Sequence, residues 1–337
     1  MSSESIDLSR SGNDVGSLGD RIARYAFFSC AFVTVLTTLA IILVLVNGAV
    51  GFFREATLVE LLGGTLSADS AAGGLETLRE GLAVQVTITE FLLGTNWSPL
   101  IEPTSYGVLP LVWGTLVVTV GSALVAIPVG TLTAIYLSEY ADESVRRTLK
   151  PILEILAGIP TIVYGFFALS FITPTILQPL FPQTGTFNAA SAAIVVGIMI
   201  IPMVSSLSED AMSSVPDSLR NAAYGLGATK FEVSTQVVVP SSLSGILAAY
   251  VLALSRAIGE TMAVALAMGM LPQITTNPLE EMQTMTSYMV QVGISDVSVG
   301  SIQYQSLFAV GLTLFAITFT MNVLSIWVRS QYREEYQ

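Results

Sequence analysis

An arginine and a glutamate stand four residues apart inside an apolar stretch of the chain. Arg256 and Glu260 both lie between Ile246 and Met270, a stretch long enough to cross a bilayer. A charge near the bilayer centre costs about 2.5 to 3.5 kcal/mol on insertion scales, so intramembrane charges usually face a bundle interior or a water-filled path. The spacing of four predicts that both side chains lie on one face of a helix, where they are able to pair.

Two interpretations fit this pair. In the first, it is a salt bridge that locks the helix against its neighbours. In the second, Arg256 is a binding step on an anion pathway, because its planar guanidinium donates two hydrogen bonds to an oxyanion and stays charged at any relevant pH. Glu260 would then hold the guanidinium in place while no anion is bound. We favour the second, since intramembrane charges are so often functional.

The residue inventory excludes several classes of enzyme. The chain has no histidine and a single cysteine, Cys30, so Ser-His catalysis, zinc-peptidase motifs and an internal disulfide are excluded. A P-loop needs a lysine directly after glycine, and neither Lys150 nor Lys230, the only lysines, follows one. We therefore expect no catalytic residue, no metal site and no cofactor. Any ATP hydrolysis would take place on a separate subunit.

A second group of residues has the spacing of a docking loop for another protein. Leu219, Ala222, Ala223 and Leu226 follow the periodicity of one helical face. Pro216 suits the first position of that helix, and two glycines after it supply a break. The pattern predicts a helix-turn-helix on the membrane surface, with these docking residues: Asn221, Ala222, Ala223, Gly225, Gly227 and Pro240.

The composition places these residues in an all-α integral membrane protein. Of the 337 residues, 52% are hydrophobic and only 11% are charged, against about 25% charged residues in ordinary soluble domains. Apolar stretches long enough to be transmembrane helices occur near Ala26–Val46, Val112–Tyr136, Ile152–Ile176, Ala189–Val204, Ile246–Met270 and Leu307–Trp327. Glu154, close to one end of the third stretch, is expected to snorkel to the interface.

The distribution of basic residues predicts the orientation of these helices. Ten of the 13 basic residues flank the stretches on one side: Arg10, Arg21, Arg24, Arg146, Arg147, Lys150, Arg220, Lys230, Arg329 and Arg333. Only Arg54 and Arg79 fall on the other side. Both termini and the docking loop are therefore predicted to be cytoplasmic, in the cell membrane.

The docking residues resemble the signature loop of ABC-importer permeases. That signature is written Glu-Ala-Ala, three residues, Gly, nine residues, then Ile-x-Leu-Pro. Ala222, Ala223, Gly227 and Pro240 agree with it in identity and spacing, whereas Asn221 stands where the family usually has Glu. Residues 91–99, 154–165 and 219–264 are further similar to phosphate-importer permeases of the PstC type, and the likeness covers roughly residues 25 to 330.

The resemblance implies a type I ABC importer permease fold with six transmembrane helices. Its expected parts are a disordered cytoplasmic tail (1–24), a first transmembrane helix (25–47), an external segment with short interfacial helices (48–108), a five-helix core (109–330) with a coupling loop at 207–240, and a cytoplasmic tail (331–337). In that family the residues that match Arg256 and Glu260 are implicated in phosphate passage.

The resemblance also implies partners and a cargo. The family pairs two different permeases, here a second one of PstA type, with an ATPase dimer of PstB type and an external phosphate-binding protein of PstS type. Residues 48–106 would help to receive the binding protein, and Ala56–Leu62 and Thr87–Leu93 are the candidate interfacial pieces. Two alternatives stay open: another oxyanion such as sulfate, molybdate or phosphonate, or a membrane scaffold or signalling component of a phosphate-sensing complex.

Overall fold

The structure is a computed structural model that describes residues 13–65 and 86–331. Predictions that fall on residues 1–12, 66–85 and 332–337, including half of the predicted N-terminal tail and nearly all of the C-terminal one, lie outside the described residues; residues 13–24 belong to α1. The described part is mostly helical, and its elements are α1 (Asn13–Thr65), α3 (Ile88–Leu93), β1 (Trp97–Ser98), β2 (Ser105–Tyr106), α4 (Leu109–Ile135), η1 (Tyr136–Tyr140), α5 (Glu143–Ala157), α6 (Thr161–Phe167), η2 (Ala168–Leu177), α7 (Gln178–Leu180), α8 (Ala189–Ser213), α9 (Asp217–Gly225), α10 (Lys230–Glu232), η3 (Val233–Val238), α11 (Val239–Ser241), α12 (Leu243–Ile258), α13 (Met262–Met268), α14 (Met285–Ile294) and α15 (Ile302–Gln331).

Within the described residues, five helices are long and apolar enough to cross a membrane, and a bent pair makes a sixth. The five are Gly19–Phe53, Leu109–Tyr140, Thr161–Leu180, Ala189–Ser213 and Ile302–Trp327, and the pair is Lys230–Ser241 with Leu243–Ile258, bent by 70°. The predicted all-α membrane fold is thus confirmed, and the number of crossings agrees with the six expected.

The predicted third stretch, Ile152–Ile176, is wrong as a single helix. Its first residues belong to α5, which ends at Ala157, and α6 begins at Thr161 with Pro160 as its N-cap. A residue that precedes proline is disfavoured in the helical region, so the chain turns at Ile159. Glu154 therefore belongs to the amphipathic helix α5, which has no fully buried residue, and not to a transmembrane helix.

The predicted fifth stretch, Ile246–Met270, is also wrong as a single helix. α12 ends at Ile258, with Gly259 as its C-cap, and α13 begins only at Met262. An irregular segment, residues 269–284, then leads into α14. The prediction that Arg256 and Glu260 share one helical face is wrong for the same reason, because Glu260 lies in the break between the two helices.

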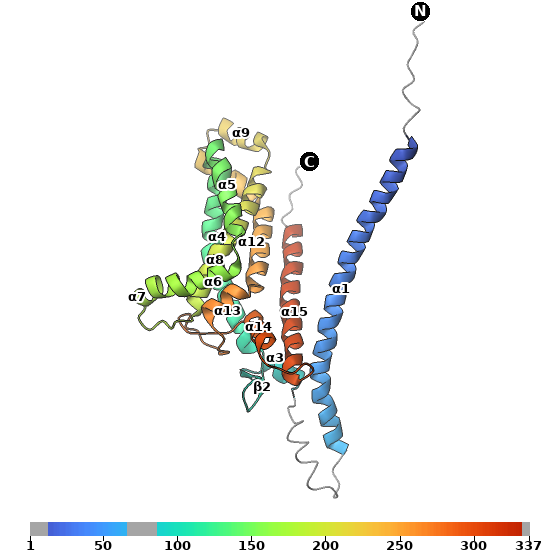
Figure 1. Ribbon diagram of the computed structural model, residues 1–337. Helices are drawn as coiled ribbons and strands as arrows, with labels where there is room; N and C mark the ends of the chain where they lie inside the picture. The colour runs from blue at the N-terminus through green and yellow to red at the C-terminus, as the bar shows by residue number, and fades with distance from the viewer. Residues whose placement is uncertain (1–12, 66–85, 332–337) are drawn as a thin grey trace, which may run out of the picture.

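Long apolar helices pack around α8 at the centre of the molecule: α4 lies along α8 in the same direction, and α12 packs on α8 as well (Figure 1). Small residues allow the close approach of α4 and α8. A Cβ added at Gly121 would lie 2.7 Å from the Cβ of Ala193, and one added at Gly130 would lie 2.7 Å from a methyl group of Val204. Close packing at small residues is the usual way in which helices associate in lipid, where the hydrophobic effect does not drive them together.

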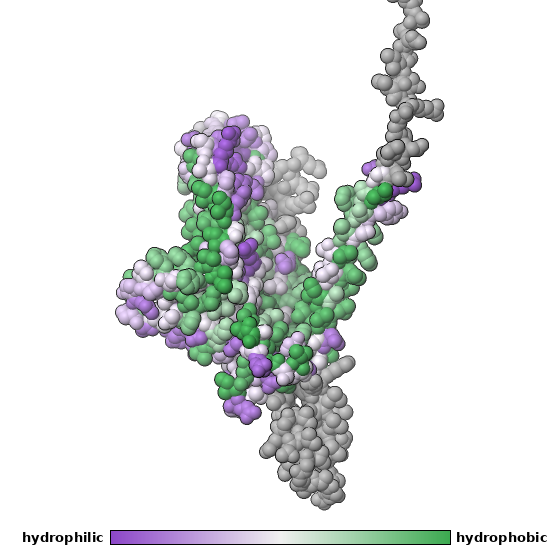
Figure 2. Space-filling model, in the orientation of Figure 1, coloured by the Kyte–Doolittle hydropathy of each residue, from purple (hydrophilic) through white to green (hydrophobic). Residues whose placement is uncertain are grey.

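The two ends of the bundle differ in what covers them. The start of α1, the end of α15, α5 and α9 all lie at one end, and α3, the β1–β2 hairpin and the start of α15 lie at the other (Figure 1). Hydrophilic residues gather at the α5–α9 end, and hydrophobic residues cover most of the middle of the visible face (Figure 2). The opposite end is closed by an aromatic cluster of Phe52, Phe91, Trp97, Tyr106 and Tyr288.

Candidate functional site

The break between α12 and α13 places the two predicted pathway residues in different surroundings. Arg256 lies in the last turn of α12 and is exposed. No ion pair involves Arg256 within residues 13–65 and 86–331, so the predicted pair with Glu260 does not form there. The guanidinium thus keeps free donors at a depth where the chain is otherwise apolar.

Glu260 points into the protein rather than toward Arg256. Only 8% of its surface is exposed, and its carboxylate accepts a hydrogen bond from the N–H of Ala263 at 3.3 Å. This bond satisfies one of the donors that are left free at the start of α13. The main-chain carbonyl of Glu260 accepts the hydroxyl of Thr286 at 2.7 Å. The structure therefore separates an outward cation from an inward carboxylate.

The predicted docking loop forms the helix-turn-helix that its sequence indicates. α9 spans Asp217–Gly225, Gly227 adopts a positive φ of 88°, and a capping box between Thr229 and Glu232 starts α10. One detail of the prediction is wrong: Pro216 is the N-cap rather than the first helical residue. Leu226, directly after the end of α9, is 90% exposed.

Most of the predicted docking residues lie on the surface. Leu219 and Ala223 pack on a buried cluster that contains Met212, Val215 and Val233. The other docking residues are exposed: Asn221, Ala222, Gly225, Gly227 and Pro240. α9 also packs against η3, so the two halves of the loop support one another. The loop thus exposes small side chains beside large hydrophobic ones, among them Leu226 and Phe231, which are 90% and 66% exposed.

Arg220 anchors this loop, a role that its sequence position does not indicate. Its guanidinium pairs with Glu139 of η1 at 3.1 Å and donates to the carbonyls of Met212, at 2.9 Å, and of Val215. The side chains of Arg220 and Glu139 are only 14% and 6% exposed. Because the two residues are 81 positions apart, no local spacing could reveal the pair; the one available signal is a lone arginine at the start of a signature-like motif.

A second charge cluster joins α5 to the end of α8. Glu209, whose side chain is 1% exposed, pairs with Arg146 and with Lys150, and Lys150 also reaches Asp210 at 2.9 Å. The hydrogen bonds to Glu209 and Asp210 raise the pKa of Lys150. Sequence reasoning used Arg146 and Lys150 only as signs of orientation. The structure shows that they also fix the amphipathic helix α5 beside the helix that carries the loop.

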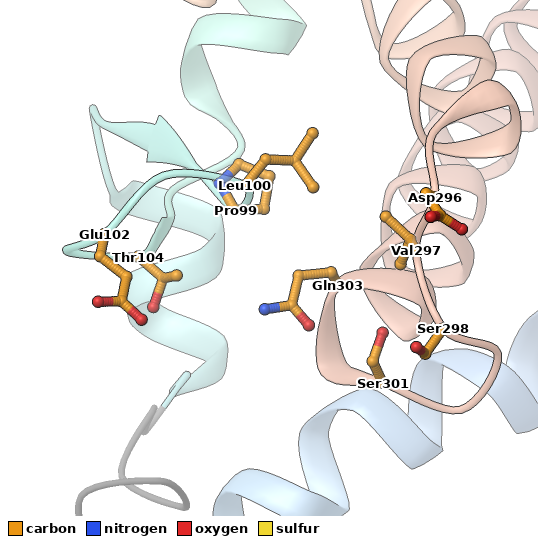
Figure 3. A pocket seen from close by; sticks show the side chains of 9 residues that line it. All are labelled: Pro99, Leu100, Glu102, Thr104, Asp296, Val297, Ser298, Ser301 and Gln303. Carbon is orange, nitrogen blue, oxygen red and sulfur yellow. The ribbon is translucent and has the colours of Figure 1, made fainter.

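The end opposite α9 carries a pocket of about 300 Å³ between the hairpin and the α14–α15 connection (Figure 3). It is lined by Pro99, Leu100, Glu102, Thr104, Asp296, Val297, Ser298, Ser301 and Gln303. Glu102 and Asp296 come from opposite sides of the pocket, as Figure 3 shows. In the part of the chain that the structure describes, no group of three or more His, Cys, Asp or Glu residues is arranged to hold a metal ion.

Comparison with known proteins identifies the family. The family described as "Binding-protein-dependent transport system inner membrane component" matches residues 126–333. A probable ABC transporter permease protein, YqgH of Bacillus subtilis, is 36% identical over 77% of this chain and 83% of its own. The phosphate transport system permease proteins PstC of Mesorhizobium japonicum and Haemophilus influenzae are 34% and 36% identical, cover 70% of this chain in each case, and are matched over 76% and 79% of their own lengths.

Solved structures support the same fold. A chain of the inward-facing MetNI methionine ABC transporter matches with a TM-score of 0.53 and 18% identity, over 70% of this chain and 100% of its own. A chain of a bacterial ABC transporter that imports alginate matches with a TM-score of 0.51 and 14% identity, over 67% and 80%. The predicted type I ABC permease fold is confirmed. The chain therefore belongs to the binding-protein-dependent transport system inner membrane components, the non-catalytic, multi-pass permease subunits of ABC transporters, which work with a separate ATPase and a substrate-binding protein.

Proposed function

We propose that this chain is the PstC-type permease of an ATP-driven importer that moves inorganic phosphate into the cytoplasm. The observation that carries the proposal is Arg256, an exposed guanidinium with no ion-pair partner among the described residues, beside a broken helix. A guanidinium binds an oxyanion through two parallel hydrogen bonds. Several curated relatives are named phosphate transport system permeases, which favours phosphate over the other oxyanions.

In this proposal the two pathway residues have different parts. Arg256 meets the phosphate directly, because its guanidinium has no ion-pair partner in the part of the chain that the structure describes. Glu260 acts from inside the protein, where its carboxylate caps α13 and so maintains the break. A cation that stays paired with a neighbouring carboxylate would have to lose that partner before it could bind an anion, and this chain avoids that cost by turning the two groups apart.

We assign the α9 end of the molecule to the cytoplasm, together with both termini. The cations Arg146, Arg147, Lys150, Arg220 and Lys230 lie in or between α5 and α10 at this end, in agreement with the positive-inside rule. An ATPase dimer of PstB type would dock on the loop around α9, and its closure on ATP would be transmitted through Arg220 to η1 and α8. A permease of PstA type would complete the pathway, and a PstS-type binding protein would deliver phosphate at the opposite end.

The test is the uptake of labelled phosphate by cells that lack this permease and are complemented with the wild-type chain or with Arg256→Gln. We expect uptake with the wild type, loss of at least about 90% of it with Arg256→Gln because the charged donor is removed, and unchanged assembly with the ATPase. Arg147→Gln is the matched control, since Arg147 is a solvent-exposed arginine on α5 with 77% of its side chain exposed. Normal uptake by Arg256→Gln would defeat the assignment of the pathway.

Competing anions test the cargo separately. Excess sulfate or molybdate should leave phosphate uptake unchanged. Inhibition by either anion, or no phosphate uptake by the wild-type chain, would assign the permease to another oxyanion. A loss of phosphate signalling with full uptake, after substitution in the α9 loop, would favour the scaffold alternative.

A further inference from the structure

The break between α12 and α13 frees main-chain groups that a continuous helix would pair. The carbonyl of Glu260 is one of them, and it accepts the hydroxyl of Thr286, which belongs to α14, at 2.7 Å. Thr286 is only 5% exposed. Within a membrane, an irregular segment is tolerated only where the protein itself satisfies its main chain. Thr286 supplies that hydrogen bond for the carbonyl of Glu260, which lies beyond the end of α12.

Thr286 is itself fixed to the rigid part of the bundle. Its hydroxyl lies 3.0 Å from that of Thr284, the N-cap of α14, and the N–H of Met285 donates to the hydroxyl of Thr115 in α4 at 3.1 Å. A Cβ added at Gly114 would lie 2.2 Å from the carbonyl oxygen of Gln283. The start of α14 therefore rests directly on the backbone of α4, and α4 packs along the length of α8.

The bond that Thr286 donates differs from those that Thr115 and Thr119 donate. Thr115 and Thr119 donate to carbonyls four residues earlier in their own helix, at 2.8 and 2.7 Å. Such donated bonds stay within one helix and do not fix it to another element. Thr286 reaches a carbonyl 26 positions away in another element. Its hydroxyl thus ties the break to α14, an element outside the broken helix.

We propose that Thr286 is the positioning residue of the candidate pathway. Its hydroxyl fixes the break against α14 and α4, and so keeps Arg256 turned outward and Glu260 turned inward. The idea rests on the proposed function, because it gives Arg256 its role. It adds a residue that touches neither the anion nor Arg256, and it predicts that the geometry of the break depends on one hydroxyl.

A thiol at Gly259 can report on the break without any reference to transport. Gly259 is exposed, its φ of −86° suits any residue, and an added Cβ would come no closer than 3.7 Å to its neighbours. The background is the chain with Cys30→Ser, which removes its only cysteine, and Gly259→Cys. In the assembled transporter we would measure the rate at which this thiol reacts with an anionic methanethiosulfonate reagent.

Three further substitutions are compared in that background. Thr286→Val removes the hydroxyl at constant shape, Thr286→Ser keeps it, and Thr119→Val is the matched control, because Thr119 is equally buried at 6% exposed and bonds only within α4. We expect Thr286→Val to change the labelling rate by about tenfold, because the buried carbonyl of Glu260 loses its hydrogen-bond partner. Thr286→Ser should restore the wild-type rate, and Thr119→Val should leave it unchanged.

The proposal is overturned if Thr286→Val labels at the wild-type rate, if Thr286→Ser labels like Thr286→Val, or if Thr119→Val shifts the rate as much. Uptake by the same transporters, without the thiol substitutions, gives a second readout. Thr286→Val should lower the maximal rate of phosphate uptake by about tenfold and leave the half-saturating concentration of binding protein unchanged, since the external surface is untouched. Failure of the wild type to take up phosphate would count against the proposed function alone, because the labelling rates decide the role of Thr286 by themselves.

Discussion

The α9 loop and the break after α12 are both places where regular helix stops, yet they are held in different ways. The loop is held by charges: Arg220 pairs with Glu139 and covers two carbonyls. The break is held by hydrogen bonds rather than by an ion pair: the hydroxyl of Thr286 donates to the carbonyl of Glu260, the N–H of Ala263 donates to the carboxylate of Glu260, and Arg256 has no ion pair among the described residues.

The difference follows from the surroundings of each site. The ion pair of the loop is buried, but it lies at the polar end of the bundle, and Arg220 also donates to two main-chain carbonyls there. Deep in the bundle, every unpaired main-chain group is costly, and hydroxyls satisfy carbonyls without bringing in charge. A single cation at that depth is then available to a ligand rather than to the fold. This contrast predicts how each region responds to substitution.

The largest effect on stability is expected from removal of the charged anchor of the loop. Arg220→Met would leave the carboxylate of Glu139, 6% exposed, without its cation. Breaking a buried pair from one side costs about 3 kcal/mol or more, so the free energy of unfolding measured by titration with a denaturing detergent should fall by about 3 kcal/mol. Co-purification of the ATPase should fall with it, because α9 loses its link to η1.

An exposed pair supplies the control for this change. Arg147 and Glu143 lie 3.2 Å apart in α5, and their side chains are 77% and 74% exposed. Arg147→Met should change stability by less than about 0.5 kcal/mol, as is usual for a surface pair. An equal loss of unfolding free energy in the two variants would mean that the charges at this end stabilise the fold through their combined electrostatic potential. The specific pair of Arg220 with Glu139 would then not be the anchor of the loop.

An intermediate effect is expected on the side of the break. Gly114→Ala would place a Cβ 2.2 Å from the carbonyl oxygen of Gln283, so α4 and the entrance to α14 must move apart. Overpacking of this kind costs about 1 to 3 kcal/mol, and we expect about 2 kcal/mol in the same titration. Phosphate uptake should fall further than stability alone explains, since Thr286 moves with α14.

Gly293→Ala in α14 is the matched control, because nothing lies within 4 Å of the added Cβ. It should leave both stability and uptake close to wild type. If Gly114→Ala weakened stability and left uptake unchanged, transport would not depend on the contact between α4 and the start of α14. The hydrogen bond from Thr286 to the break would then have no consequence for transport.

The sequence predicted the apolar helices and the loop better than it predicted the breaks. The docking loop was recognisable because its small residues, its two glycines and its proline follow a fixed local spacing. The breaks at Pro160 and at Gly259 were not predicted, because the apolar residues on both sides of each point were assigned to one continuous helix in spite of the charged residues Glu154, Arg256 and Glu260 near them. What interrupts α12 is the use of Glu260 as a cap for α13 and its bond to Thr286, which are contacts between distant elements.

The charged anchors were missed for a related reason. The partners Arg220 and Glu139, and Lys150 and Glu209, are separated by 81 and 59 positions. Their pairing follows from the packing of α8 against α4, η1 and α5, which no pattern within a single helix contains. Arg256 was identified from its place in an apolar stretch, its chemistry and the family resemblance, whereas its lack of an ion pair among the described residues could be seen only when the break was placed.

The smallest of these effects concerns the turn inside the loop. Gly227 has a φ of 88° and nothing within 4 Å of an added Cβ, so Gly227→Ala changes only the backbone preference. An L-residue in a left-handed conformation costs about 1 kcal/mol, and the unfolding free energy should fall by that amount. Gly225→Ala, two residues earlier at the end of α9 and equally unobstructed, should be neutral or slightly stabilising because alanine favours helix.

Because Arg220 holds the other end of α9, the strained turn should still form in Gly227→Ala, and the ATPase should still co-purify. Loss of the ATPase from Gly227→Ala alone would show that the turn, and not the charged anchor, sets the docking surface.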